Sequence, residues 1–333
     1  METIIDGAIL LDFFKSQPKQ IPFGTEEDNL IWNSFWSYIK SKTDLDVRNY
    51  KPDDIFHEAF FKHLTTGRGD SKIVIGNESP IHKEGVVLAK KPSTFYCING
   101  DDESNKEIVE NNNGFIISFL NNYKKQWERL SLVNHNKTLS VREDAYIKSN
   151  TLKSWDELDN YLTKFTDAVI VDNYIFSHND LIPSNFEKIL VQLNKATPIK
   201  FNLTIYTFEG DKTKLNGSIL MRKLDSIIEE HNINCNIQLI IADRKVKEHD
   251  RGIFTNYLRI KSGDSFNYFD SQGRVKTNGT DIAFASMTEP NERAAAMNVL
   301  YEVNENIKYL KERKVLIPFI YGECDNRLLT QFD

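Results

Sequence analysis

The sequence predicts an α/β protein with two domains. Its 333 residues favour two ordinary hydrophobic cores over one large core. In the second half, near-continuous apolar segments begin at Ala168, Phe201 and Ile237, and amphipathic segments separate them. Apolar strands that alternate with helices are typical of a parallel or mixed sheet covered on both faces. We therefore expect a layered α/β domain over 151–333, preceded by an α+β domain over 1–150.

The composition is that of a soluble globular protein, with 27% charged and 40% hydrophobic residues and a net charge of -6. Such an acidic chain is not expected to adhere to nucleic acid or anionic lipid over its whole surface, so a phosphate site has to be a local basic patch. No apolar run is long enough to span a bilayer, and acids stand where a signal peptide carries positive charge, so we expect a cytoplasmic protein. Cys97, Cys235 and Cys324 are isolated and odd in number. They predict neither a disulfide framework nor a metal site, and no cofactor is expected.

The first 150 residues give secondary-structure signals but few chemical ones. Apolar spacing predicts helices over 28–41, 53–64 and 114–130. Strands are expected at 72–75 and within 85–98, and the polar stretch 101–113 is interpreted as an exposed loop or a short helix. The glycine-containing segment 65–71 is interpreted as a turn, because it lacks the sequence context of a phosphate-binding loop. Its role is left open, and one of the alternatives below has it bind a protein partner.

The second half opens with a helix signal at Ser154, where a hydroxyl is followed three residues later by Glu157 as in a capping box. That helix is expected to continue through Phe165. The elements expected before the central motif are a strand at 168–176, a helix at 184–193, a strand at 201–208, a helix at 215–230 and a strand at 237–242. Those expected after it are strands at 265–269 and 282–287, a long helix from Pro290 and a final strand at 315–321.

The segment from His249 to Gly263 has a spacing that predicts chemistry. His249 and Arg251 are two residues apart, so on a strand their side chains project from the same face. An imidazole can attack phosphorus or accept a proton, and a guanidinium can hold two phosphate oxygens at once. The apolar residues that follow continue the strand as far as Asn256. The turn near Gly263 and Ser265 supplies hydroxyls and backbone N–H groups.

Basic residues surround this motif. They are Arg244, Lys245, Lys247, Arg259 and Lys261. They form either an anion-binding patch or a solvated face, and the sequence leaves both interpretations open. The expected catalytic residues are His249, Arg251 and Asn256, and the expected phosphate-binding residues are Arg251, Arg259, Lys261, Gly263 and Ser265. We expect His249, Arg251, Asn256 and Ser265 to line one concavity, with Arg259 or Lys261 near its rim.

This spacing resembles the motif of the phospholipase D superfamily, in which His-x-Lys is followed by an Asp and then by a Gly. Arg251 stands in the Lys place and Asn256 in the Asp place. Residues 154–333 resemble the phospholipase D-like domain at the C-terminus of MIT-domain proteins. The resemblance rests on VIVDNYIF from Val169, LTIYTF from Leu203, LDSIIEEHNINCNIQLII from Leu224, and the motif itself. It implies a phospholipase D-like fold and a phosphodiester ligand. Well-known members of that branch also carry His-Asp-Arg, are regarded as inactive and bind phosphoinositides.

A second His-x-Lys occurs at His135 to Lys137. Arg142 stands where the motif requires Asp, and no glycine follows in register. We interpret this segment as a solvated loop.

Three functions remain open at this stage. The first is a nuclease or other phosphodiesterase with His249 as nucleophile and Arg251 as phosphate clamp; with one motif it requires a homodimer. The Asn/Lys/Ile-rich composition suits a bacterial genome and favours an effector of a defence or toxin system. The second is a non-catalytic module that binds a phosphoinositide headgroup or nucleic acid. The third is a structural motif in a protein-interaction subunit.

Overall fold

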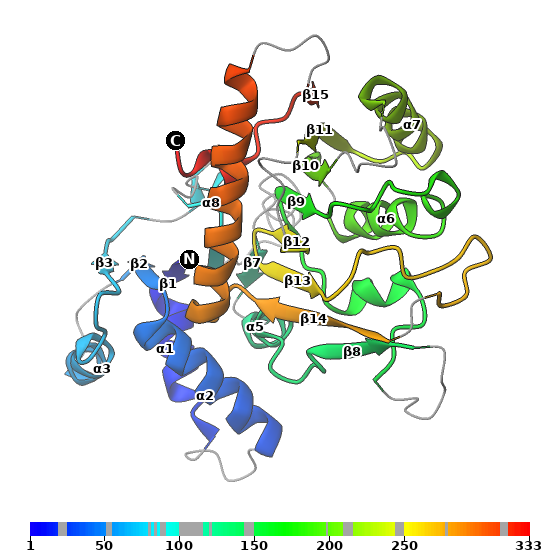
Figure 1. The fold of residues 1–333 in the computed structure, drawn as a ribbon. Coiled ribbons are helices and arrows are strands. Elements are labelled where there is room, and N and C mark those ends of the chain that lie inside the picture. The colour runs from blue at the N-terminus through cyan, green and yellow to red at the C-terminus, as the bar shows by residue number, and fades with distance from the viewer. Residues whose placement is uncertain are drawn as a thin grey trace. The chain divides into compact units, whose positions relative to one another are not determined.

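The computed structural model describes the chain except residues 19–24, 51–54, 79–80, 83–84, 87–90, 100–115, 120–121, 143–149, 198, 209–215, 244–249, 277–278 and 314–318. The described residues form two compact units (Figure 1). The first contains residues 1–134 and 287–290, and the second contains 135–286 and 291–333. The larger unit therefore begins before residue 150, where the sequence placed the boundary.

The first unit is built on a five-stranded parallel sheet. Its strands are β1 (Glu2–Asp6), β2 (Asp44–Arg48), β3 (Ile73–Ile75), β6 (Thr94–Ile98) and β7 (Ile116–Phe119). Their order is β3-β2-β1-β6-β7, and every neighbouring pair is parallel. Parallel strands need crossover connections, and here α1 (Gly7–Lys15), α2 (Glu26–Ser41) and α3 (Ile55–Thr65) lie between strands in the chain. This unit is α/β, which corrects the α+β arrangement expected from the sequence.

One predicted helix of this unit is partly a strand. The segment expected to be helical over 114–130 contains β7 and then α5 (Tyr123–Ser131). In β7, Ile116 lies opposite Phe95 of β6 and is buried. Trp127 and Leu130 do occupy the buried face of a helix, so the helical spacing holds only for the second half of the segment. A β-branched pair at the start of β7 suits a strand position against the sheet. The short strands β4 (Ile81–His82) and β5 (Gly85–Val86) form a separate antiparallel pair.

Aromatic rings fill the core of the first unit. The ring of Phe13 stacks on Trp32 with centroids 4.8 Å apart, and Phe35 lies 5.0 Å from Trp127. The indole N–H of Trp32 donates to the carbonyl of Phe13 at 2.9 Å, which satisfies its polar atom inside the core. The helix α2 that carries Trp32 and Phe35 begins at the capping residue Thr25. The amphipathic helix predicted over 28–41 is thus confirmed.

A buried arginine joins three segments of the first unit. Arg68 is 6% exposed and donates to the carbonyls of Ile39 at 2.6 Å and Thr43 at 2.9 Å. It also donates to Ser71 and Lys72. Burial lowers the pKa of this guanidinium. The turn predicted at 65–71 is therefore a structural clamp, in which one side chain fastens the end of α2 to the chain around β2 and β3.

The second unit contains an eight-stranded mixed sheet in the order β15-β11-β10-β9-β12-β13-β14-β8. The parallel strands are β9 (Asp167–Val171), β10 (Phe201–Phe208) and β11 (Cys235–Ala242). The strands in antiparallel pairs are β12 (Gly252–Thr255), β13 (Leu258–Ser262), β14 (Thr280–Ser286), β8 (Thr138–Val141) and β15 (Ile320–Gly322). The strand of the motif, β12, lies inside the sheet between β9 and β13, as predicted.

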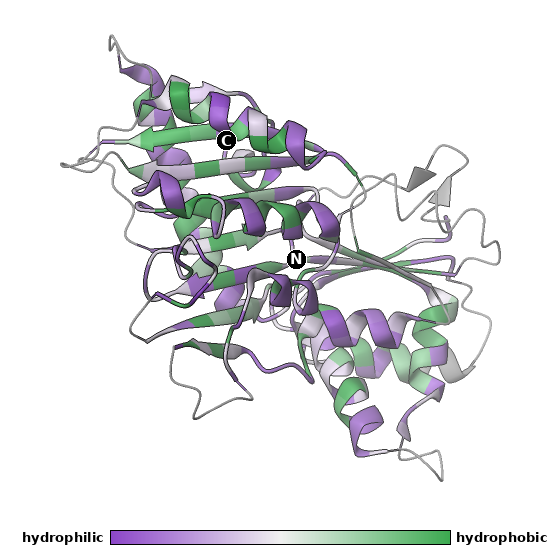
Figure 2. Cartoon of the chain, turned by 90° about the vertical axis from the view of Figure 1, so that its right-hand side faces the viewer, coloured by the Kyte–Doolittle hydropathy of each residue, from purple (hydrophilic) through white to green (hydrophobic). Residues whose placement is uncertain are grey.

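Helices cover both faces of this sheet (Figure 1). The helices α6 (Phe186–Ala196) and α7 (Gly217–Glu230) connect parallel strands and lie on one face, and α8 (Pro290–Glu312) lies on the other. Figure 2 shows apolar strand residues between helices whose outer surfaces are polar. The α/β class of the second unit is thereby confirmed. None of the described helices is both long and apolar enough to cross a membrane.

Three segments of the second unit differ from the sequence prediction. The helix expected from Ser154 to Phe165 is a short 3-10 helix, η2 (Trp155–Asn160). The strand expected at 168–176 ends at Val171, and residues 265–269 are not a strand. In these segments, contacts with distant residues replace the hydrogen bonds of a regular helix or strand. The indole of Trp155, for example, stacks on Tyr268 at 5.1 Å. The unit also contains η3 (Asn179–Leu181) and α9 (Arg327–Thr330).

Replacing Arg68 with Met should lower the free energy of unfolding of the first unit by about 3 kcal/mol or more, because several buried carbonyls lose a charged donor. Three of the four tryptophans, Trp32, Trp36 and Trp127, belong to this unit, so tryptophan fluorescence in a urea titration reports on it. The exposed Lys62→Met is the matched control and should change the stability by less than about 0.5 kcal/mol. Equal unfolding midpoints for the two variants would contradict the clamp.

Candidate functional site

The carboxyl ends of the parallel strands meet the start of β12 at one edge of the larger sheet. Val171, the last residue of β9, pairs with both Gly252 of β12 and Tyr206 of β10. Asp172 and Arg251 are each one residue further along, so the register places them opposite one another on the same face. We call this place the carboxyl edge and define it by Asp172, Tyr174, Arg251, Ser265 and Tyr268.

Asp172 is a fully buried carboxylate that joins two turns. One of its oxygens accepts from the backbone N–H of Tyr174 at 2.9 Å. The other accepts from the N–H of Phe266 at 2.7 Å and from the hydroxyl of Ser265 at 2.8 Å. Burial raises the pKa of Asp172, while these hydrogen bonds and the charge of Arg251 oppose the increase. The carboxyl group therefore fixes the geometry of the edge and binds a proton more readily than an exposed aspartate.

Arg251 places a half-buried guanidinium at this edge, with 23% of its side chain exposed. Its Nη1 donates to the carbonyl of Gly263 at 3.1 Å, and its central carbon lies 5.6 Å from the ring centroid of Tyr174. Its Nε is buried and has no hydrogen-bond partner among the described residues. The carboxylate of Asp264 is 3.8 Å away and 62% exposed, so this ion pair is weak. The buried Nε is out of reach of a ligand, so any capacity for another acceptor lies on the terminal nitrogens of the guanidinium.

Neutral polar groups complete the edge. The hydroxyls of Tyr268 and Ser262 are in contact, and burial raises the pKa of Tyr268, so this hydroxyl stays protonated. Asn267 donates from its side-chain amide to the carbonyl of Tyr174 at 2.7 Å. The amide oxygen of Asn267 and the hydroxyl of the fully buried Thr207 have no partner among the described residues. The edge therefore contains hydroxyl and amide groups beside one cation.

Three of the predicted site residues come together here. Arg251 and Gly263 are hydrogen-bonded, and Ser265 reaches the same place through Asp172. His249 lies outside the described residues, as do Arg244, Lys245 and Lys247.

Asn256 lies at the other end of β12, so its predicted place beside Arg251 is wrong. Its side-chain oxygen accepts from the backbone N–H of Thr166 at 2.8 Å and of Asp167 at 2.9 Å, at the start of β9. The four residues of β12 separate the two positions, which corresponds to roughly 17 Å along a strand. An amide here holds the start of β9.

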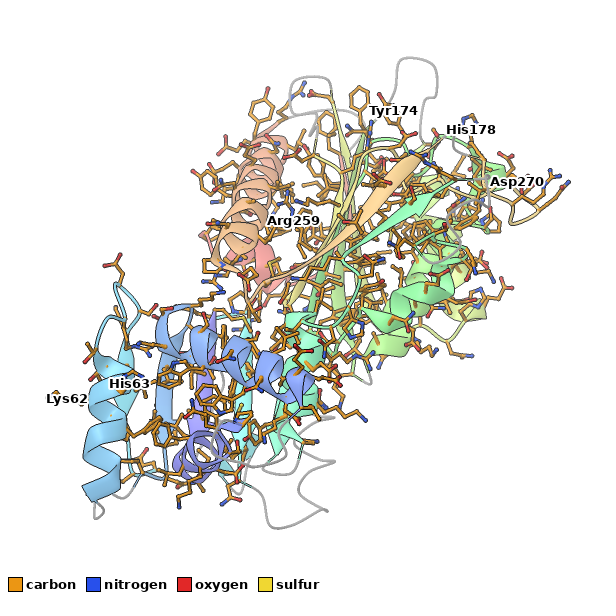
Figure 3. The ribbon with its side chains drawn as sticks, turned by 90° about the horizontal axis from the view of Figure 1, so that it is seen from below. Lys62, His63, Tyr174, His178, Arg259 and Asp270 are labelled. Carbon is orange, nitrogen blue, oxygen red and sulfur yellow. The ribbon has the colours of Figure 1, made fainter. Side chains whose placement is uncertain are left out.

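Arg259 and Lys261 point to the opposite face of the sheet, so they are not at the rim of the carboxyl edge. Arg259 lies opposite Phe254 and Lys261 lies opposite Gly252, so both share the face of those two residues. Arg251 precedes Gly252 by one residue and therefore faces the other side. Both cations contact Glu292 of α8, at 3.5 Å and 3.3 Å. Figure 3 shows Arg259 beside that helix and well apart from Tyr174. Their charge fastens α8 to the sheet.

Asp172, Tyr174 and Tyr268 are the residues of this edge that the sequence prediction missed. One signal was available, because Asp172, followed by Asn173, interrupts the apolar run VIVDNYIF. A charged residue inside an apolar run requires a partner or a function, and here it also ends the strand.

No protein-family model and no curated protein matches this chain. Among the described residues, no three His, Cys, Asp or Glu side chains are grouped so that they can hold a metal ion. The argument for function therefore rests on the geometry of the carboxyl edge.

Replacing Asn256 with Ala should destabilise the protein by about 1–3 kcal/mol, because two buried backbone N–H groups lose their acceptor. Any ligand affinity that depends on Arg251 should stay within about twofold of the wild type, since the two residues occupy opposite ends of β12. Urea unfolding and ligand titration of the same preparation measure both quantities. A variant of normal stability that lost ligand affinity would place Asn256 in the site after all.

Replacing Asp172 with Asn should change how stability depends on pH. Because the pKa of Asp172 is raised in the folded state, the folded wild type binds the proton more tightly than the unfolded chain. Wild-type stability is therefore highest, as far as this group is concerned, below its unfolded pKa of 3.8, and falls as pH rises through the folded value. The asparagine variant lacks this dependence, so its stability relative to wild type should increase between about pH 4 and pH 7. A constant difference across that range would contradict the raised pKa.

Proposed function

We propose that the carboxyl edge binds the phosphate of a phosphodiester or phosphomonoester, with Arg251 as the group that contacts the anion. The observation that carries this proposal is the state of Arg251. Its guanidinium is partly exposed and is fixed by the carbonyl of Gly263, and the carboxylate that pairs with it among the described residues, Asp264, is itself 62% exposed. A guanidinium matches the geometry of two phosphate oxygens.

The surroundings support an anion more than a cation. Ser262, Ser265 and Tyr268 make the surroundings of the guanidinium polar, with the Ser265 hydroxyl donating to Asp172 and the buried Tyr268 hydroxyl in contact with Ser262. Asp172 is negative when ionised, but its carboxylate is fully buried and is satisfied by three donors. Its raised pKa also means that proton uptake can remove this charge when an anion binds. The acid therefore weakens anion binding less than an exposed carboxylate would.

Cleavage of the ester is the enzymatic form of the same proposal. It assigns His249 as the nucleophile and follows from the resemblance to the phospholipase D superfamily. Since each chain has one such motif, the enzymatic form also needs a second copy of the chain to supply the other imidazole. The binding form needs Arg251 alone and is compatible with the same edge.

Replacing Arg251 with Gln should weaken binding of a short fluorescein-labelled single-stranded oligonucleotide by about tenfold to a hundredfold, as expected for loss of a charge-assisted bidentate contact. Fluorescence anisotropy at fixed ionic strength measures the affinity. Lys261→Gln is the matched control, since it removes a cation from β13 on the opposite face and should leave the affinity nearly unchanged. Equal losses in the two variants would indicate non-specific charge, and no loss in Arg251→Gln would exclude this site.

His249→Ala separates the two forms. In the enzymatic form it should abolish cleavage of the labelled oligonucleotide while the affinity falls far less than in Arg251→Gln, because the imidazole acts in bond breaking. Gel analysis of the oligonucleotide after long incubation detects cleavage. Intact oligonucleotide with the wild-type protein, together with Arg251-dependent binding, would establish the binding form.

A further inference from the structure

We propose that the ligand of the carboxyl edge is a single-stranded nucleic acid, and that Tyr174 stacks on one of its bases while Arg251 contacts a phosphate. This inference rests on the proposed function and adds the class of ligand. It assigns Tyr174 a role in specificity that the sequence motif does not contain.

Hydrogen bonds hold the backbone of Tyr174 at both its N–H and its carbonyl group. Its N–H donates to Asp172 at 2.9 Å, and its carbonyl accepts from the amide of Asn267 at 2.7 Å. The other residues of this turn, Asn173, Ile175 and Phe176, are at most 4% exposed, whereas Tyr174 is 36% exposed. An exposed ring on a rigid turn loses little conformational entropy when a flat partner stacks on it.

The ring lies next to the proposed phosphate contact. The guanidinium carbon of Arg251 is 5.6 Å from the centroid of the Tyr174 ring. Because the guanidinium lies over one face of the ring, a base would stack on the other face, and the phosphate at the guanidinium would belong to a neighbouring nucleotide of the same strand. Proteins that bind single strands combine these two elements, a cation for the backbone and an aromatic side chain for the base.

The surroundings of the ring argue against a lipid surface. In the segment between Val171 and α6, residues His178, Asn179 and Asp180 are exposed and polar. Figure 3 shows His178 at the same end of the unit as Tyr174. Tyr174 is the large hydrophobic side chain exposed in the described part of this connection. Membrane binding needs several apolar side chains or a cluster of cations, and the described residues here offer neither.

A base-paired duplex is also disfavoured, because a single ring can stack only on a base that is free of its own neighbours. Bases in single strands meet this condition at little cost. The expected ligand is therefore single-stranded DNA or RNA, with little preference for sequence, since every base has a face that can stack.

The test compares an oligonucleotide with an abasic oligomer of the same length, which keeps the phosphodiester backbone and lacks the bases. Wild-type protein should bind the base-containing strand about tenfold more tightly, as one stacked base predicts. Tyr174→Leu should lose this preference and bind both oligomers equally, and Tyr174→Phe should retain it. Tyr309→Leu is the matched control, because Tyr309 is also exposed and lies 5.7 Å from an arginine, Arg313.

The outcomes separate this inference from the proposed function. Loss of binding to both oligomers in Arg251→Gln, with an equal loss for both in Tyr174→Leu, would keep the phosphate site and overturn base stacking. If Arg251→Gln bound both oligomers with the affinity of the wild type, the proposed function itself would be overturned. Tighter binding of wild type to phosphoinositide-containing vesicles than to the oligonucleotide would overturn the choice of nucleic acid, as would the absence of any preference for bases. Circular dichroism of each variant checks that it is folded.

Discussion

The carboxyl edge depends on the buried carboxylate of Asp172. It accepts hydrogen bonds from Tyr174, just after β9, and from Ser265 and Phe266, which follow β13. One side chain thereby fixes two turns that are about ninety residues apart in the chain. Its charge has a cost in a buried place, and Arg251, opposite it in the strand register, offsets part of that cost. The guanidinium itself is held at the edge by its hydrogen bond to the carbonyl of Gly263. Because an anion beside Arg251 disfavours the charged carboxylate, proton uptake by Asp172 and anion binding favour each other.

The two ends of β12 have different tasks. Arg251 precedes the strand and faces the carboxyl edge, whereas Asn256 follows it and holds the backbone of Thr166 and Asp167. The spacing between these two residues is thus the length of β12, and it does not bring them into one site. This distinction changes the meaning of the replacements in the motif. The Arg in the Lys position faces the carboxyl edge, and the Asn in the Asp position holds the sheet.

Elements whose burial follows one simple period were predictable from the sequence. The strand β10 runs over 201–208 as predicted, and the helix predicted over 215–230 is α7, which begins at Gly217. Elements shaped by a single tertiary contact were not. The run from Ala168 looks like one long strand because nothing local shows that the Asp172 carboxylate turns the chain towards Ser265. The clamp made by Arg68 is equally invisible in sequence, since its partners are backbone carbonyls, which every residue has.

The site residues were predictable only where they share a strand face. Alternation correctly linked Arg251 to the turn after β13, but the sequence cannot show how β12 and β13 align, and that register decides which cations face which side. Once Lys261 lies opposite Gly252, it and Arg259 must point away from Arg251 and towards Glu292 of α8. The pleat of the sheet therefore directs the basic residues of the sequence to two different faces. Among the described residues of the motif, Arg251 is the cation that reaches the carboxyl edge. A single guanidinium attracts many anions with similar strength, because a charge contact carries little information about the rest of the ligand. If the proposed ligand binds, discrimination at such an edge has to come from neutral groups of fixed position, such as the ring of Tyr174.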